Sequence, residues 1–490
     1  MTRLSASYDV FVLKLTLFLL PLATSVFYGL RLANEWGTDF GVYFVGGMSI
    51  QNNFGLYSGF FDHKGPTYYA FINIISWLVP YSKFGAILTL QLTCAIWFSA
   101  IYFVIKTQKL GLLSSALVTL FSISVLFAQP SNSSIAIFIA ALQLVSISTA
   151  ITFSKVGEIK WLGISAIFLV LAALARIDSI IIIPLIVYFI CKTKKSRKHV
   201  LVVFSSTCIA LFFLLLFLFA NLLQFGLQDY WQQAILFNFS TYAEESGFYV
   251  ANSHLGAAKL LMITFIKNGY LVLFVLLLTA FKIKLQNLLR LEFFWILAYG
   301  FFAYVLVGSE KDYHLFIFYV FMLIGVTAFF SEKNPPENLL VVTSFVLLLV
   351  LAISTTTKLA SQSICLITQE KCYEPYSEVL VESEILSPKK VEFLFNQGWP
   401  YLFNQSKPTI SFTPYFPLAK SIEGVSKLFI AESNGVGPDR VFWVSDHDID
   451  LLRKLPNNLV RDFLANKILI ATTTKGFSAY INEGRKQVVN

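Results

Sequence analysis

Long apolar runs constrain this chain more than any other sequence feature. A helix needs roughly 20 apolar residues to cross the hydrocarbon core of a bilayer, and runs near that length recur from the N-terminus to residue 356. Hydrophobic residues make up 56% of the 490 residues and charged residues 13%, whereas soluble domains carry about 25% charged residues. Polar groups this scarce do not cover the surface of a soluble fold. The sequence therefore predicts a polytopic α-helical membrane protein and excludes a soluble enzyme, a disordered chain and a disulfide framework.

Eleven transmembrane segments are expected, at 10–30, 84–105, 110–128, 135–153, 161–175, 179–191, 200–223, 263–281, 293–308, 314–330 and 338–356. The first follows Arg3 and no small-x-small cleavage site follows it, so we interpret it as a retained signal anchor. The adjoining segments 161–175 and 179–191 are short, which predicts tilted or broken helices.

Loop charges predict the orientation of these segments. With the N-terminus in the cytoplasm, the inner loops contain the basic residues Lys106, Lys109, Lys155, Lys160, Lys192, Lys194, Lys195, Arg197, Lys198, Lys282, Lys284, Arg290 and Lys333. The outer loops contain the acids Asp39, Asp62, Asp229, Glu244, Glu245, Glu310 and Asp312. Lys and Arg gather in cytoplasmic loops of membrane proteins, so the net charge of +9 indicates topology and no nucleic-acid partner. An odd number of crossings places residues 357–490 outside.

The apolar stretch 67–80 does not fit this series of spans. It has only 14 residues and lies between Pro66 and Pro80. That length favours a re-entrant or juxtamembrane helix. If it were a full span, every later loop would lie on the opposite side of the membrane. The basic run 192–198 would then lie outside, whereas Lys and Arg gather in cytoplasmic loops.

Residues 357–490 differ in character from the first 356 and predict a separate, small extracytoplasmic α/β domain. Short apolar runs suggest strands at Val391–Phe395, Thr409–Phe412, Lys427–Ile430, Val441–Val444, Ile468–Thr472 and Phe477–Ile481. Residues 451–466 have helical spacing. Cys365 and Cys372 are disulfide candidates if this region is extracytoplasmic, and two free thiols are the alternative.

The first outer loop, residues 31–66, is too long for a simple connector. Asp39 opens a stretch with helical apolar spacing, as in a helix lying on the membrane. The sequence Asp62-His63-Lys64-Gly65-Pro66 follows at the start of the next apolar segment. A carboxylate there suits a general base, and a lysine suits a phosphate at headgroup level. The alternative is a solvated interfacial loop whose charges anchor it to headgroups.

Four further clusters have functional and structural interpretations. Arg176 and Asp178 lie between two short apolar segments, as a phosphate contact or as a mutual ion pair. Residues 308–314 are interpreted either as a functional motif that opens a later span or as an ordinary short loop. The loop 224–256 is interpreted either as a segment that selects an acceptor or as a carrier of interfacial aromatic anchors. Residues 446–448, Asp-His-Asp, resemble a metal trio but better fit the end of a strand and a helix cap.

The first outer loop resembles that of a known family. Asp39 shortly after the first span, followed by GLYSGFFDHKGPTYY at 55–69, resembles GT-C-type glycosyltransferases, in particular relatives of protein O-mannosyltransferases and lipid A aminoarabinose transferases. Phe40 stands where that family usually has a second acid, which leaves open whether Asp39 acts alone or shares its role with Asp62.

The resemblance implies a GT-C-like fold with juxtamembrane helices in the first outer loop, in a bacterial cytoplasmic (inner) membrane. It also implies transfer of a sugar, usually with inversion, from a polyprenyl-phosphate donor to a glycan, lipid or protein acceptor on the outer face. No cofactor is expected, and a divalent ion is left open. The implied site residues are Asp39 and Asp62 as catalytic residues, with an aspartate as the base, Lys64, His63, Arg176, Lys311 and His314 on the donor phosphate, and Tyr43 and Tyr313 in the pocket.

Two other classes of protein compete with this interpretation. A polysaccharide polymerase or ligase has a similar hydropathy profile, but its basic residues are expected in a large late outer loop. A transporter or flippase is expected to have broken, polar helices near mid-membrane in repeated halves, and the sequence shows few buried charges and no repeat.

Overall fold

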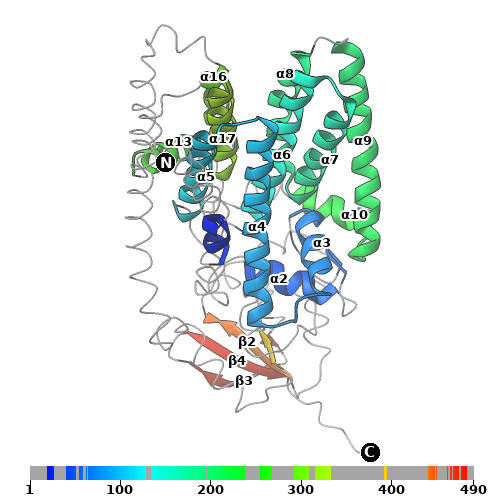
Figure 1. Ribbon diagram of the computed structural model, residues 1–490. Coiled ribbons are helices and arrows are strands. Elements are labelled where there is room, and N and C mark those ends of the chain that lie inside the picture. The colour runs from blue at the N-terminus through cyan, green and yellow to red at the C-terminus, as the bar shows by residue number, and fades with distance from the viewer. Residues whose placement is uncertain are drawn as a thin grey trace, which may run out of the picture. The chain divides into compact units, whose positions relative to one another are not determined.

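A computed structural model describes the residues 19–26, 40–50, 55–58, 62, 64–128, 134–193, 197–237, 254–267, 292–307, 315–332, 391–393, 440–446, 449, 461, 464–465, 467–473 and 476–482 (Figure 1). The chain forms two compact units. The bundle unit comprises Met1–Leu32, Leu90–Leu216 and Gly247–Ser363. The loop unit comprises Ala33–Thr89, Phe217–Ser246 and Ile364–Asn490.

Helices occupy most of the predicted spans. The bundle unit holds most of α4 (Lys83–Thr107) and of α9 (Arg197–Leu222), together with α5 (Leu112–Ala128), α6 (Ser134–Val156), α7 (Ile159–Ala175), η3 (Ile177–Ile182), α8 (Ile183–Cys191), α13 (His254–Lys267), α16 (Glu292–Val307) and α17 (Leu315–Glu332). Among the described residues, three helices are long and apolar enough to cross a membrane, namely Phe84–Thr107, Ser134–Val156 and Arg197–Leu222.

Other predicted spans are described only in part. Residues 19–26 of the first span are helical, and 338–356 lie outside the described residues. The span predicted at 263–281 overlaps the end of α13, which already begins at His254. The residues of this predicted span from 268 onward lie outside the described ranges. The number of spans therefore remains a prediction.

The core of the bundle unit is built around α6. Every residue from Ser134 to Phe153 is buried, with α7, α8 and α17 packed against the helix. The Ser146 hydroxyl donates to the Ser165 carbonyl at 2.8 Å, and the Ser165 hydroxyl donates to the Ser146 carbonyl at 2.9 Å. Small hydroxyl residues of this kind let membrane helices approach closely and join them by hydrogen bonds. By contrast, α9 buries only Phe204 and Leu216, which fits a helix whose apolar face meets lipid.

The predicted break between 161–175 and 179–191 is present. α7 ends at Ala175, and Arg176 has extended backbone angles. The chain then forms the 3-10 helix η3 before α8 begins, with Pro184 in its first turn. Because proline lacks an N–H and clashes with the carbonyl four residues earlier, the helix restarts at this point.

The loop unit contains short helices, α2 (Phe40–Ser49), α3 (Pro66–Ile75), α10 (Leu227–Tyr230) and the π-helix η4 (Trp231–Leu236). α3 begins with a proline, which suits the first helical position. Its 10 residues reach about 15 Å, half of what a span requires. α2 packs on α3 where Gly47 leaves room, since a Cβ on Gly47 would lie 2.6 Å from Cγ2 of Ile72.

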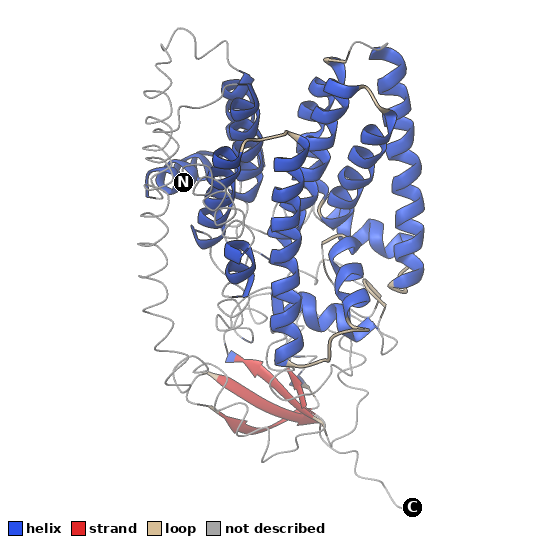
Figure 2. Cartoon of the chain, viewed as in Figure 1, coloured by secondary structure: helices blue, strands red, loops and turns tan. Residues whose placement is uncertain are grey.

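The C-terminal part of the loop unit contains a four-stranded sheet (Figure 2). The strands are β1 (Val391–Phe393), β2 (Val441–Ser445), β3 (Lys467–Thr472) and β4 (Phe477–Asn482), in the order β1-β2-β4-β3. β1 runs parallel to β2, and both β2 and β3 run antiparallel to β4. These strands confirm four of the predicted runs. The runs at 409–412 and 427–430 lie outside the described residues, as does nearly all of 451–466.

Candidate functional site in the first outer loop

The Asp62 and Lys64 side chains form a buried pair in the loop unit. Asp62 is 0% exposed and Lys64 is 7% exposed, with Lys64 Nζ 3.8 Å from Asp62 Oδ1. The backbone N–H of Lys64 donates to the same oxygen at 3.2 Å, and the Tyr69 hydroxyl donates to Oδ2. Both carboxylate oxygens are therefore bound by donors. This matters because burial of an unpaired charge is very costly.

The start of α3 explains how these groups meet. Pro66 opens the helix directly after the Asp-His-Lys-Gly motif, so Tyr69 lies in its first turn. The ring of Tyr43, on α2, lies under the Lys64 ammonium with Nζ 5.1 Å from the ring centroid. The same ring makes edge-to-face contacts with Tyr68 at 5.7 Å and Tyr69 at 6.0 Å. The Lys64 charge is thus held by a carboxylate and an aromatic face, both of which attract cations.

A second layer joins the motif to the chain that follows α9. The Tyr57 hydroxyl donates to the Lys64 carbonyl at 2.6 Å, and the Gln233 side-chain amide donates to the Tyr57 carbonyl. Leu56 N–H donates to the Leu223 carbonyl at 2.9 Å. Tyr57 has a φ of +66°, a left-handed conformation that is costly for an aromatic residue. Hydrogen bonds to Lys64 and to the chain that follows α9 therefore hold Tyr57 in this conformation.

Burial keeps the phenols of this layer protonated. Burial is the main cause that raises the pKa of Tyr57 well above its usual value, and the charges of Tyr230 and Asp62 raise it further. Burial also raises the pKa of Tyr230 to about 12. The Tyr57 ring packs on Phe225 at 5.2 Å and on Tyr230 at 5.9 Å. At neutral pH Tyr57 therefore remains a hydrogen-bond donor to the Lys64 carbonyl.

The first turn of α3 has polar groups that an anion could satisfy. The N-cap residue, Gly65, provides no side-chain cap, and the Thr67 hydroxyl is buried without a hydrogen-bond partner among the described residues. Helix N-termini favour anions through their N–H groups and dipole. With the Lys64 ammonium beside them, these groups are chemically suited to a phosphate.

Of the remaining predicted site residues, the structure describes only Arg176. Arg176, in the bundle unit, is 15% exposed and forms a two-point ion pair with Asp178, with Nε 3.0 Å from Oδ1. This is the structural alternative that the sequence allowed, and a phosphate contact stays a prediction. Seven predicted residues lie outside the described residues: Asp39, His63, Lys311, Tyr313, His314, Cys365 and Cys372.

Asp446 lies directly after β2, as the strand-end interpretation expects. It accepts a hydrogen bond from the Ser478 hydroxyl at 2.7 Å, and its own N–H donates to the Gly476 carbonyl at 2.7 Å. His447 and Asp448 lie outside the described residues, which contain no cluster of three or more His, Cys, Asp or Glu side chains.

Sequence reasoning missed Tyr69, Tyr57 and Gln233. Tyr69 was within reach, because a helix that starts at Pro66 returns its first turn to the residues just before it. Gln233 carried no signal, since it contacts the motif across 176 residues of sequence and lies in a π-helix, a rare conformation.

The comparison with solved structures supports the fold that the sequence resemblance implied. The chain is similar to the crystal structure of ArnT from Cupriavidus metallidurans bound to undecaprenyl phosphate. The likeness covers 94% of this chain and 97% of ArnT, with a TM-score of 0.55 and 11% sequence identity. No protein-family model and no curated protein matches the chain.

Proposed function

We propose that this protein is a membrane glycosyltransferase that takes a sugar from a polyprenyl-phosphate donor and transfers it to an acceptor on the extracytoplasmic face of a bacterial inner membrane. The observation that carries the proposal is the likeness to ArnT over nearly the full length of both chains, in a structure where ArnT binds undecaprenyl phosphate. The buried Asp62–Lys64 pair at the start of α3 adds independent support, because it holds a cation beside a helix N-terminus suited to phosphate.

The proposed reaction needs one base and one cation. The acceptor hydroxyl gives its proton to a carboxylate while its oxygen attacks the anomeric carbon of the sugar. The bond between that carbon and the phosphate oxygen breaks, and the polyprenyl phosphate leaves as an anion. A single displacement inverts the anomeric carbon and requires no enzyme nucleophile. A lysine stabilises the departing phosphate without acting as an acid.

The structure favours different roles for the two acids. Both Asp62 oxygens accept hydrogen bonds, and the side chain is enclosed, so we propose that Asp62 fixes Lys64 in place. Asp39, directly before α2, then becomes the first candidate for the base. We assign His63, Lys64, Arg176, Lys311 and His314 to the donor phosphate and Tyr43 and Tyr313 to the pocket.

A transfer assay on the purified full-length chain tests the proposal, with undecaprenyl-phosphate-linked sugars as donors and released undecaprenyl phosphate as the readout. Asp39→Asn is expected to lower kcat by about 10²-fold or more, and Lys64→Gln to lower kcat through weaker leaving-group stabilisation. Glu158→Gln is the matched control, because Glu158 belongs to an exposed lysine–glutamate pair of the bundle unit.

The outcomes separate the alternatives. Full activity in both Asp39→Asn and Asp62→Asn would overturn the roles given to these acids. Lengthening of a lipid-linked glycan would indicate a polymerase, and movement of the carrier without a covalent product would indicate a flippase.

A further inference from the structure

The bundle unit contains a groove between two of its helices. Its volume is about 260 Å³, and α8 and α16 form its walls through Leu185, Tyr188, Trp295, Ile296 and Tyr299. The volume is below the roughly 300 Å³ at which pockets for whole small-molecule ligands begin. With its apolar walls, the groove is suited to part of an acyl chain.

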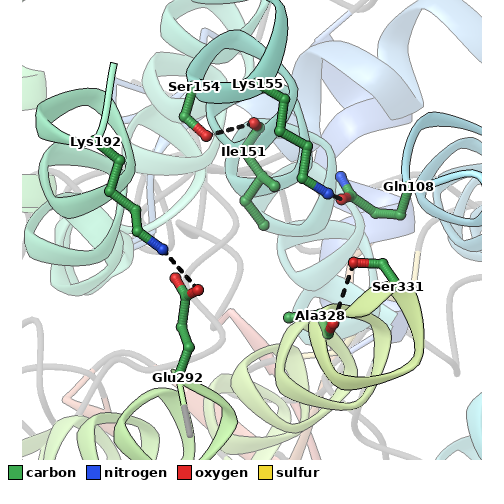
Figure 3. A network of polar contacts seen from close by, with 8 residues as sticks. All are labelled: Gln108, Ile151, Ser154, Lys155, Lys192, Glu292, Ala328 and Ser331. Carbon is green, nitrogen blue, oxygen red and sulfur yellow. Dashed lines mark hydrogen bonds and ion pairs between the residues drawn. The ribbon is translucent and has the colours of Figure 1, made fainter. Parts of the chain in front are cut away.

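One end of the groove is charged. Glu292 lines it, and Lys192 Nζ donates to Glu292 Oε2 at 2.7 Å (Figure 3). Lys192 is 45% exposed and Glu292 is 15% exposed. Burial lowers the pKa of Lys192, but the hydrogen bond and charge of Glu292, with a smaller contribution from Tyr188, outweigh it and raise the pKa overall. The pair is thus a fixed zwitterion with no net charge.

Both members of the pair have bonding capacity left. The Lys192 ammonium donates to Glu292 and lies 5.3 Å from the centroid of the Tyr188 ring, and an ammonium has three protons to donate. The other oxygen of Glu292, Oε1, is buried with no hydrogen-bond partner among the described residues. The pair therefore keeps the capacity both to donate and to accept a further hydrogen bond at the same place.

The residues around this ion pair are of the kinds found at the headgroup level of a membrane. Trp295 is 59% exposed and Tyr188 is 46% exposed, as in the aromatic belts of membrane proteins. Lys155 and Gln108 form another polar contact at 3.0 Å in the same region of the bundle unit (Figure 3). These residues lie on or beside the loops that the sequence assigns to the cytoplasmic side.

We propose that this groove binds a phospholipid with a primary-amine headgroup, of the phosphatidylethanolamine type, in the cytoplasmic leaflet. The headgroup phosphate contacts the Lys192 ammonium, the headgroup ammonium contacts the Glu292 carboxylate, and one acyl chain enters the groove between Tyr188 and Trp295. A zwitterionic headgroup complements a zwitterionic pair, whereas a purely anionic headgroup offers the Glu292 carboxylate no cation in return for the phosphate that it brings close. A trimethylated headgroup keeps the charge but donates no hydrogen bond.

Native mass spectrometry of the delipidated full-length protein tests this proposal. The probes are phosphatidylethanolamine, phosphatidylcholine and phosphatidylglycerol with identical acyl chains. We expect retention of phosphatidylethanolamine about tenfold above phosphatidylcholine, the value of one hydrogen bond to a charged group. Glu292→Gln should reduce that preference severalfold, and Trp295→Ala should weaken retention of all three lipids. Glu158→Gln removes the acid of a similar pair outside the groove and should change nothing.

Several results would overturn the proposal. They are equal retention of phosphatidylethanolamine and phosphatidylcholine by the unaltered protein, stronger retention of phosphatidylglycerol, and a preference that survives Glu292→Gln. Lys192→Arg keeps the positive charge and should keep the preference, so a loss of preference in this variant would also overturn the proposal.

Discussion

The two units each contain a close lysine–carboxylate pair, and the pairs differ in an instructive way. In the loop unit, Lys64 and Asp62 are 3.8 Å apart and 7% and 0% exposed. In the bundle unit, Lys192 and Glu292 are 2.7 Å apart but 45% and 15% exposed. The shorter pair is the one that water reaches. Exposed pairs contribute little to stability, whereas loss of one partner from a buried pair leaves an uncompensated charge. Burial, and not distance, therefore separates their energetic roles.

The first prediction breaks each pair in turn. Asp62→Asn leaves the Lys64 charge buried without its carboxylate, so we expect a loss of about 3–5 kcal/mol in the free energy of unfolding. Glu292→Gln should cost under about 1 kcal/mol, because water and salt screen Lys192. Denaturant titrations of both variants in the same detergent check the difference. Equal losses would show that burial does not separate the two pairs.

The second prediction concerns the support of the buried pair. Tyr69→Phe removes the hydroxyl that donates to Asp62, and a hydrogen bond to a charged group is worth about 1.5–3 kcal/mol. The same change at Tyr102, which is 65% exposed on α4, is the control and should stay within about 0.5 kcal/mol of the unaltered protein. Thermal unfolding in detergent gives both values, and matching shifts would argue against a role for the Tyr69 hydroxyl.

The third prediction compares how the contributions of Lys467 and Lys192 to stability change with pH. Lys467 in β3 lies over the Phe442 ring at 4.9 Å, and burial lowers its pKa to about 8. Between pH 8 and its ordinary value near 10.5, the unfolded chain binds more protons at this lysine than the folded chain, so its contribution to stability rises with pH.

Lys192 has the opposite sign. Its pKa is raised, so the stability it contributes is present below pH 10.5 and is lost as pH rises through the higher folded value. We expect Lys467→Met to remove a rise in the free energy of unfolding with pH, and Lys192→Met to remove a fall. Unfolding titrations of both variants from pH 7 to 11 measure these two changes. Parallel pH curves for the two variants would contradict the assignment.

Local pattern was enough to predict many elements of the fold. Apolar length located the long helices α4, α6 and α9, and the short paired segments predicted the break at Arg176, where charge and Pro184 interrupt the helix. Four of the β-strands fell within one or two residues of the predicted runs. In each case the signal lies within one stretch of chain.

Contacts that depend on distant segments could not be predicted in this way. Charge asymmetry placed Lys192 and the residues just before Glu292 on one side of the membrane, but it did not show that they form a pair across 100 residues. The motif placed Asp62 beside Lys64, yet the hydrogen bond from Gln233 to the Tyr57 carbonyl joins segments 176 residues apart. The likeness to ArnT supports the fold.

Gly55 has a consequence for how the backbone of the loop unit moves. A Cβ on this residue would lie 2.0 Å from the Gln224 carbonyl oxygen, so the two backbones touch with no side chain between them. Next to this contact, Leu56 is bonded to Leu223, and Tyr57 is bonded to Gln233. Because of these contacts, we expect the chain after α9 and the backbone that supports Lys64 to move together. A single methyl group at Gly55 would force these two backbones apart.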